Sequence, residues 1–579
     1  MQLLRKLYLI LPFIGIAISH CKQTPAPISD ETLTIRFNRE PDILNPVLSS
    51  TVNAATIENL LFLPLMDFDP YTQEIKPVLS SGPTTLLRQG SSVGYKIILR
   101  EEAKWDDGKP VTVADVVFSL KAILNPFIPS SGKRGVIYPI DSIETFSNPR
   151  ELIFWTDDNY FLDEQSFTNN FVLQESKYDS LMLLRNLSWK ALKDLNPNDT
   201  SSEISKIARA FVYQFSNPYL GREGVSGCGP YRIEQWVSNQ YLRLKRKESW
   251  WGSSLRDSNA NFSAYPSEIT FRIIPEEANA ISALKEGLLD FMATDINPAN
   301  FKSMSEDSTL RQKVNFIAGP PIRYVYLALN NRSVLLNQPE TRKALARILD
   351  LDQLQKNLFQ GYAQRIIAPF QPAKSYYDHS LALIPFDIEL AKSNLLEAGW
   401  MDTNKNGTVD KKINNRTTEL KLRLLVTPGG LGQQLAIHMQ EQALKVGVAI
   451  EIIPKPIHLL LENVRNHDFE IAALSETQYP GPDDPYTYWH SESYSSNGQN
   501  FTGFGSPKTD SIIDQIRHSE PGTLRTNLYK SLQKEIYEQQ AAIFLFAPQN
   551  LMALSKKWEG RAASVRPGYF VNDFKPVSQ

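Results

Sequence analysis

The spacing of apolar and polar positions changes along the chain, and each change marks a strand or a helix. Residues 95–100 have the character of a strand. Residues 106–110 (Asp-Asp-Gly-Lys-Pro) then predict a turn, because glycine accepts positive φ and proline sets the exit direction. Apolar residues recur at helical spacing over 113–124, and Thr112 with Asp115 is close to a capping box. The stretch therefore predicts a strand, a turn and a capped helix.

The same patterns continue downstream and indicate an α/β protein. Two alternating runs at 231–236 and 241–245 flank a polar turn and predict a hairpin. The segment 420–453 is patterned as strand, helix and strand, a βαβ unit that requires two parallel strands. We also expect 176–199 to be helical. Further strands are expected at 33–37, 269–274, 288–292, 324–330 and 469–474, and further helices at 276–286 and 386–398.

Three blocks of sequence together resemble a known family. The first is 104–119, which contains Lys-Trp-Asp-Asp-Gly-Lys-Pro-Val-Thr and Ala-Asp-Val-Val-Phe-Ser. The second is Gly-Cys-Gly-Pro-Tyr at 227–231, followed by the predicted hairpin and by Trp-Trp-Gly at 250–252. The third is Ala-Leu-x-x-Gly-x-x-Asp at 283–290. These blocks are similar to those of the family 5 extracellular solute-binding proteins of bacterial importers, which include oligopeptide-, dipeptide- and nickel-binding proteins.

The resemblance implies an α/β, two-lobed periplasmic-binding-protein fold of type II, similar to cluster C. It has mixed sheets with helices on both faces and a ligand cleft between the lobes. A chain of 579 residues is too long for a single core, and we divide it into three domains. Domain I is discontinuous and domain II is inserted into it. The assigned ranges are 31–66, 214–318 and 547–579 for domain I, 67–213 for domain II and 319–546 for domain III.

The first residues resemble a bacterial lipoprotein signal. Two basic residues precede an apolar run at 7–18 that is too short for an ordinary membrane-spanning helix. Cys21 follows, so we expect residues 1–21 to contain the signal peptide and the lipid-acylated cysteine. Residues 22–30, rich in proline and polar residues, then form a tether. These features predict a protein of the cell envelope, held by lipid at the periplasmic side of a membrane or at the cell surface.

Charge, cysteine content and the lack of common catalytic motifs argue against several classes of function. A net charge of −2 and a pI near 6.4 argue against a nucleic-acid binder, which needs a basic face. With Cys21 carrying lipid, Cys228 has no partner for an internal disulfide. Cys228 stands between two glycines in a predicted turn, which favours a buried small residue over a catalytic thiol. The chain has no His-Glu-x-x-His or Cys-x-x-Cys motif, and we expect neither enzyme activity nor a cofactor.

The first candidate ligand contacts lie near the N-terminus of the globular part. Ser50, Thr51, Val52 and Asn53 fall where related peptide binders offer backbone groups to ligand. The same polar residues are equally suited to cap the helix expected to begin near residue 54. Both roles stay open at this point.

The second group of candidates lies in the predicted domain III. Tyrosine offers apolar contact area with a polar tip, and two tyrosines occur on the strand at 324–330. The segment 475–489 is the richest in residues able to contact a ligand. The candidates are Tyr324, Tyr326, Ser475, Glu476, Thr477, Tyr479 and Asp483.

Related peptide binders place an aspartate shortly before an acidic residue followed by proline, and it holds the ammonium group of the peptide. Here that pair is Asp484-Pro485, and no acid occupies the corresponding place. A buried ammonium group needs an acid, so we predict that Glu476 takes this role. Asp483 and Asp484 are also explained as caps of a turn, which we prefer for Asp484.

One segment imitates a calcium-binding loop. Residues 402–407 read Asp-x-Asn-x-Asn-Gly, but Ile413 stands where the loop requires a bidentate glutamate. An Asx-rich turn without metal is therefore the expected structure.

The resemblance implies that the chain is an exported substrate-binding lipoprotein. Its expected partners are a small solute, with a short peptide favoured, and the permease subunits of an ABC importer. A sensor or adhesive lipoprotein without a transport role is an alternative. An exported hydrolase is less favoured, but carboxylate pairs converge only in the fold and sequence does not exclude them.

Overall fold

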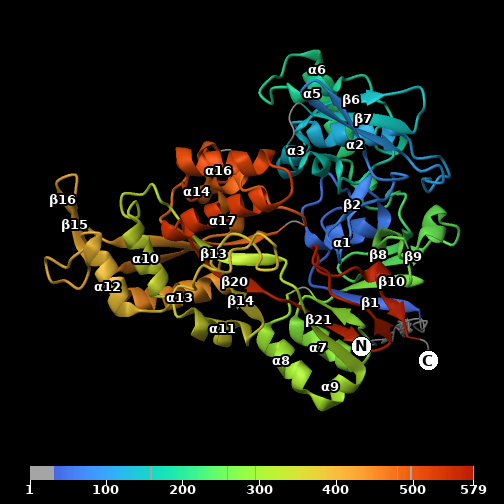
Figure 1. The fold of residues 1–579 in the computed structure, drawn as a ribbon. Helices are drawn as coiled ribbons and strands as arrows, with labels where there is room; N and C mark the ends of the chain where they lie inside the picture. The colour runs from blue at the N-terminus through green and yellow to red at the C-terminus, as the bar shows by residue number, and fades with distance from the viewer. Residues whose placement is uncertain are drawn as a thin grey trace, which may run out of the picture.

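The computed structural model describes residues 31–156, 160–256, 258–293, 295–478, 480–495 and 498–577. The predictions for the signal peptide, Cys21, the tether and Tyr479 lie outside these residues. Two lobes are visible, one built on two sheets and the other on one (Figure 1). The α/β, two-lobed fold is the one expected. Within the described ranges, no helix is both long and apolar enough to cross a membrane.

The first lobe contains a seven-stranded mixed sheet with the order β12-β21-β11-β1-β10-β9-β8. The expected hairpin is present as β8 and β9, with a register shift between Ile233 and Gln235. The strand expected at 288–292 is reduced to the two residues of β11. The strands are β1 (Thr32–Phe37), β8 (Tyr231–Val237), β9 (Tyr241–Arg246), β10 (Glu268–Ile273), β11 (Phe291–Met292), β12 (Val314–Gly319) and β21 (Asn550–Ser555). The helices that accompany it are α1 (Val52–Leu61), α7 (Glu277–Lys285), α8 (Pro298–Glu306) and α9 (Ser308–Lys313).

A four-stranded sheet, β4-β5-β7-β6, forms the other part of the first lobe. The strand, turn and helix expected between 95 and 124 are confirmed. Thr112 and Asp115 form the capping box of α2, and Asp115 also accepts the backbone N–H of Glu175 at 2.9 Å. The elements are β4 (Thr85–Gln89), β5 (Ser92–Ile98), β6 (Ile140–Thr145), β7 (Glu151–Thr156), α2 (Val113–Leu124), α3 (Ser131–Ile137) and α6 (Glu203–Phe215). Two short strands, β2 (Met66–Phe68) and β3 (Ile75–Pro77), pair beside it.

The prediction of a helical segment at 176–199 is wrong. Only α4 (Glu175–Tyr178) and α5 (Trp189–Lys193) are helical there. The Asp179 carboxylate accepts the backbone N–H groups of Leu183 and Leu184, both at 2.9 Å. A side chain that bonds nearby backbone groups offers an alternative to the helix, and the chain turns instead.

The second lobe is built on a six-stranded sheet with the order β14-β20-β13-β19-β17-β18. The βαβ prediction is confirmed. β17 and β18 pair directly in parallel, and α13 connects them in the sequence. The strands are β13 (Arg323–Leu329), β14 (Ala363–Arg365), β17 (Lys421–Val426), β18 (Ala449–Pro454), β19 (Ile471–Thr477) and β20 (Ala542–Pro548). The helices are α10 (Pro339–Arg347), α11 (Leu351–Phe359), α12 (Ile388–Glu397), α13 (Leu431–Leu444), α14 (Ile457–Arg465), α15 (Tyr486–Trp489), α16 (Pro507–His518) and α17 (Thr523–Glu538).

The lobes are connected by two crossings that lie next to each other. Residues 320–322 join β12 of the first lobe to β13 of the second, and Gln549 joins β20 back to β21. β12 pairs with β21 and β13 pairs with β20, both antiparallel. The second crossing falls beyond the boundary that we placed between 546 and 547. The division into three domains stays a prediction.

Candidate ligand-binding site

The strand pair β13–β19 brings the predicted tyrosines and the predicted acid together. Tyr324 lies opposite Glu476, and Tyr326 lies opposite Leu474. β19 continues to Thr477, so Ser475, Glu476 and Thr477 belong to the strand and not to the loop after it. Because alternate residues of a strand share a face, Tyr324 and Tyr326 point the same way.

Tyr324 and Tyr326 are buried aromatic residues of the second lobe. Each is about one-twentieth exposed, and both rings lie about 6 Å from that of Phe544. Burial raises the pKa of Tyr324 well above its usual range, and the neighbouring Tyr326 and Glu476 raise it further. The phenols therefore stay protonated and act as neutral hydrogen-bonding groups.

Glu476 is a half-buried carboxylate on β19. Its Oε1 accepts a hydrogen bond from Tyr488 Oη at 2.9 Å. Burial raises the pKa of the Glu476 carboxyl, and the bond from Tyr488 partly opposes this rise. Among the residues that the structure places, no basic side chain forms an ion pair with it. Glu476 can therefore accept a cationic group from a ligand.

The neighbours of Glu476 differ in how far they are available. Ser475 is exposed, and its hydroxyl donates to the backbone oxygen of Tyr324 at 3.1 Å. Thr477 pairs with Arg323 at the end of the strand. Tyr479 lies outside the described residues, so its role stays a prediction.

The Asp483 carboxylate is already engaged within the second lobe. Its Oδ2 accepts a hydrogen bond from Tyr376 Oη at 2.6 Å. The Asp483 backbone N–H donates back to Tyr376 Oη at 3.1 Å. Tyr529 Oη donates to the Asp483 carbonyl. Burial raises the pKa of Asp483, while the nearby Lys374 lowers it. These contacts support a structural role, holding the chain that follows β19 against α17.

The polar residues at 50–53 cap α1. Thr51 is the N-cap, and its Oγ1 accepts the backbone N–H of Ala54 at 3.2 Å. Ser50 donates to Asp42 through its backbone N–H and its hydroxyl, at 2.9 and 2.8 Å. The capping role is confirmed, and contact with ligand at Ser50, Thr51, Val52 and Asn53 stays a prediction.

Three residues near Glu476 are missed by the sequence analysis. Tyr488 supplies the hydrogen bond to Glu476, and Tyr376 holds Asp483. Gln478 is buried and donates through Nε2 to the Pro369 carbonyl at 3.1 Å. Its Oε1 has no hydrogen-bond partner within the described part of the chain. Tyr376 and Gln478 bond to partners more than 100 positions away, so no local pattern marks them. Tyr488 lies only 12 positions from Glu476, but no motif marks the pair.

A well-defined cavity lies elsewhere, along strand β8 of the first lobe. Its volume is about 750 Å³, and none of the candidate residues lines it. Charged groups on its walls are paired within the protein, as Lys247 is with Asp106 and Arg232 with Glu234. β8 is an edge strand of the seven-stranded sheet, and its register shift makes it a poor partner for an added strand. Cavity size therefore does not locate the predicted ligand site.

Two places where the sequence offers a possible nucleophile have surroundings that do not suit one. Cys228 is buried as expected, and burial raises the pKa of its thiol to about 12. Residues 90–94 read Gly-Ser-Ser-Val-Gly and so match the Gly-x-Ser-x-Gly pattern. However, they form the turn between β4 and β5, where Gln89 pairs with Ser92. This is a hairpin, whereas a nucleophile elbow joins a strand to a helix.

The loop at 402–407 uses its oxygens for backbone hydrogen bonds. Asp402 accepts the N–H groups of Asn406 and Gly407 at 3.1 and 3.0 Å. This is the Asx-rich turn that was predicted. In the part of the chain that is described, no group of three or more His, Cys, Asp or Glu side chains could hold a metal ion.

Comparison with known proteins identifies the family. The profile of the bacterial extracellular solute-binding proteins, family 5 (middle region), matches residues 93–498. The chain belongs to this family. Its members are binding proteins.

Relatives with assigned names match over most of their length. The oligopeptide-binding protein AppA of Bacillus subtilis is 23% identical over 546 residues, which cover 93% of this chain and 90% of the relative. Its structure in complex with a nonapeptide has a TM-score of 0.72 at 21% identity, covering 94% of this chain and 99% of AppA. The structure of NikA from Brucella suis in complex with Fe(III)-EDTA has a TM-score of 0.73 at 18% identity, covering 94% and 100%. These structures establish the fold.

Proposed function

We propose that the protein is an exported, lipid-anchored substrate-binding protein. It captures a short peptide between its lobes and delivers it to the permease subunits of an ABC importer. Cys21 carries the lipid, and residues 22–30 hold the globular part away from the membrane surface.

The relatives support a peptide as the ligand class. Similar structures include AppA with a nonapeptide and the ABC-transporter-associated periplasmic binding protein DppA of Helicobacter pylori with the peptide STSA. Relatives with other cargo are also similar, among them NikZ of Campylobacter jejuni with Ni(L-His). The fold alone therefore leaves peptide and metal chelate open, and the choice depends on side chains.

Glu476 carries the proposal. Among the described residues it is an acid that forms no ion pair, and it lies on the strand pair that also holds Tyr324, Tyr326, Ser475 and Thr477. A peptide with a free amino terminus supplies the missing cation, and aromatic side chains beside it suit a ligand of mixed polarity. Candidate contacts at 50–53 would supply backbone groups from the other lobe, and main-chain bonds to a peptide are indifferent to its sequence.

Thermal unfolding in the presence of peptide pools tests this function. A ligand that binds only the folded protein adds about 2.7 kcal/mol of stability when its free concentration is a hundred times its dissociation constant. Pools of di- to nonapeptides are expected to raise the unfolding temperature clearly. A rise with a nickel–histidine chelate and none with any peptide pool would reject the peptide and favour a chelate.

A sensor without a transport role is the second candidate function. It shares ligand capture with the first, so binding does not separate the two. Growth of a deletion strain on peptides as the source of an essential amino acid does separate them, because loss of an importer protein abolishes this growth.

A further inference from the structure

The two lobes touch at a place separate from the crossing strands. Residues 160–165, which follow β7 of the first lobe, lie against α16 and α17 of the second. The backbone N–H of Phe161 donates to the carbonyl of Arg517 at 2.9 Å. The Phe161 ring packs against the hydrophobic cluster of the second lobe, with the Arg525 guanidinium 4.7 Å from its centroid. This contact joins backbone to backbone across the lobes.

Tyr160 adds a polar contact beside Phe161. Its Oη donates to Asp484 Oδ2 at 2.6 Å, and Arg517 Nε lies 3.3 Å from the same oxygen. The Arg517 guanidinium also lies over the Tyr160 ring, 4.6 Å from its centroid. A hydroxyl bonded to a carboxylate, with a cation on its ring, is among the stronger polar arrangements available.

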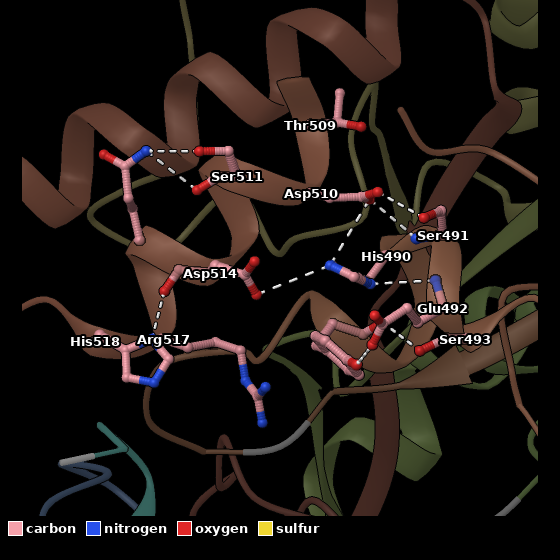
Figure 2. A network of polar contacts seen from close by, with 12 residues as sticks. His490, Ser491, Glu492, Ser493, Thr509, Asp510, Ser511, Asp514, Arg517 and His518 are labelled. Carbon is pink, nitrogen blue, oxygen red and sulfur yellow. Dashed lines mark hydrogen bonds and ion pairs between the residues drawn. The ribbon is translucent and has the colours of Figure 1, made fainter. Parts of the chain in front are cut away.

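The stack continues into the second lobe. The same guanidinium lies 4.3 Å from the centroid of Tyr486, whose ring stacks on His490 at 4.3 Å with an angle of 20°. Figure 2 shows the His490 ring between Asp510 and Asp514 of α16, with its Nε2 3.9 and 3.8 Å from their Oδ1 atoms. Tyr160, Arg517, Tyr486 and His490 thus stack in this order, and His490 contacts the carboxylates of α16.

The chain that carries Asp484 is held close to the first lobe at a second point. Gly481 has φ +79°, and a Cβ there would lie 3.0 Å from Gln165 Nε2 and 3.4 Å from the Phe68 ring. Lys374 Nζ donates to the Gly481 carbonyl from the opposite side. A residue with a side chain would both strain the backbone and press on the first lobe.

We propose that Tyr160 and Phe161 together with Asp484 and Arg517 form an interlobe latch that holds the two lobes against each other. Asp484 lies seven residues after the end of β19, in the segment braced by Asp483 and Gly481. The latch therefore fixes the lobes to each other and fixes the segment after β19 in one position. It goes beyond ligand capture, and it does not depend on the identity of the ligand.

Hydrogen exchange at the Phe161 amide tests the latch in the ligand-free full-length protein. This amide is bonded across the lobes, so its exchange rate reports how often the latch opens. Tyr160→Phe removes the hydroxyl and keeps the ring. Because a hydrogen bond to a charged group contributes enough to shift such an equilibrium roughly tenfold, we expect exchange at Phe161 to become about ten times faster.

A matched control is present within the first lobe. Tyr71 Oη donates to Asp573 Oδ2 at 2.8 Å, and the Arg561 guanidinium lies over the Tyr71 ring at 3.3 Å. Tyr71→Phe removes the same kind of bond without touching the lobe contact. It is expected to leave exchange at Phe161 unchanged, and amides of β5 are expected to stay protected in both variants.

A double-mutant cycle with Asp484→Asn completes the test. If Tyr160 and Asp484 act through their mutual bond, Tyr160→Phe adds little to exchange at Phe161 once Asp484 is changed. The latch is overturned if Tyr160→Phe leaves the Phe161 amide as slow as in the wild type. It is equally overturned if Tyr71→Phe accelerates that amide as much, since the effect would then be general loosening. Neither result would bear on whether the protein binds peptides.

Discussion

Tyr324 and Glu476 lie directly opposite each other in the antiparallel pair of β13 and β19. Burial and the nearby Glu476 charge raise the pKa of Tyr324, and burial raises the pKa of Glu476. In the described part of the chain, the carboxylate accepts a hydrogen bond from the neutral Tyr488 hydroxyl and forms no ion pair. The cation that would stabilise its charge has to come with the ligand.

Replacing Glu476 by glutamine tests the amino-terminal contact. We expect Glu476→Gln to weaken a peptide with a free amino terminus on the order of a hundredfold, because a buried cation would lose its partner. The N-acetyl form of the same peptide should bind both proteins alike. Titration calorimetry with the two peptides measures this difference. Equal affinity of the wild type for both forms would show that the protein does not recognise an amino terminus.

The pH dependence of binding follows from the raised pKa of Glu476. A charged carboxylate is needed to hold an ammonium group, so affinity should fall as the pH drops through this pKa, which lies above the usual glutamate value. Tyr488→Phe removes the hydrogen bond that favours the charged form. The midpoint of the affinity profile should then move to higher pH. An unchanged midpoint would mean that Tyr488 does not set the ionisation of Glu476.

Glu58 predicts a pH dependence of stability that is independent of ligand. It lies buried on α1, and burial raises its pKa to about 8 from an ordinary value of 4.5. Between these values the folded protein holds a proton that the unfolded chain has released. The stability of the wild type therefore falls by about 1.4 kcal/mol per pH unit through this window on account of this group.

Glu58→Gln removes that contribution. The free energy of unfolding of the variant minus that of the wild type should become more positive from pH 5 to pH 8. Urea unfolding at several pH values measures it. Glu144→Gln is a control at an exposed glutamate. A difference that stays constant with pH would show that Glu58 is ionised in the folded protein.

Cys21 predicts where the protein is found in the cell. Several acyl chains on one residue anchor a protein stably, whereas one chain binds only marginally. Cys21→Ala should therefore release the protein from the membrane fraction, which immunoblotting of separated fractions detects. If the variant stays with the membrane, the apolar run at 7–18 is acting as an uncleaved anchor.

Sequence predicted the elements whose causes are local. The capping box at Thr112 and Asp115, the β8–β9 hairpin and the parallel pair in the βαβ unit all follow from residues close together in the chain. The prediction of a helix at 176–199 failed because the Asp179 side chain competes for backbone N–H groups that a helix needs. Helical spacing of apolar residues does not reveal such a competition.

The site was predicted only in part, and for a physical reason. Glu476 was singled out as the nearest acid upstream of Asp484-Pro485, but its donor Tyr488 is recognisable only after α15 has folded back beside β19. The bond between Tyr160 and Asp484 spans 324 positions of sequence. Contacts of this kind are set by how whole lobes meet, and no local pattern encodes them.

The adjacent crossings between the lobes determine how the molecule can move. Since β12 pairs with β21 and β13 with β20, the crossings form one two-stranded ribbon, and sliding of the lobes would break pairs at both ends. Rotation about the ribbon is the motion that remains. Tyr324 stands two residues from this pivot, whereas α16 lies at the top of the second lobe, away from the crossings (Figure 1). Displacement during a rotation grows with distance from the axis. A small rotation at β13 therefore moves Asp484 farther, relative to the first lobe, than it moves Tyr324.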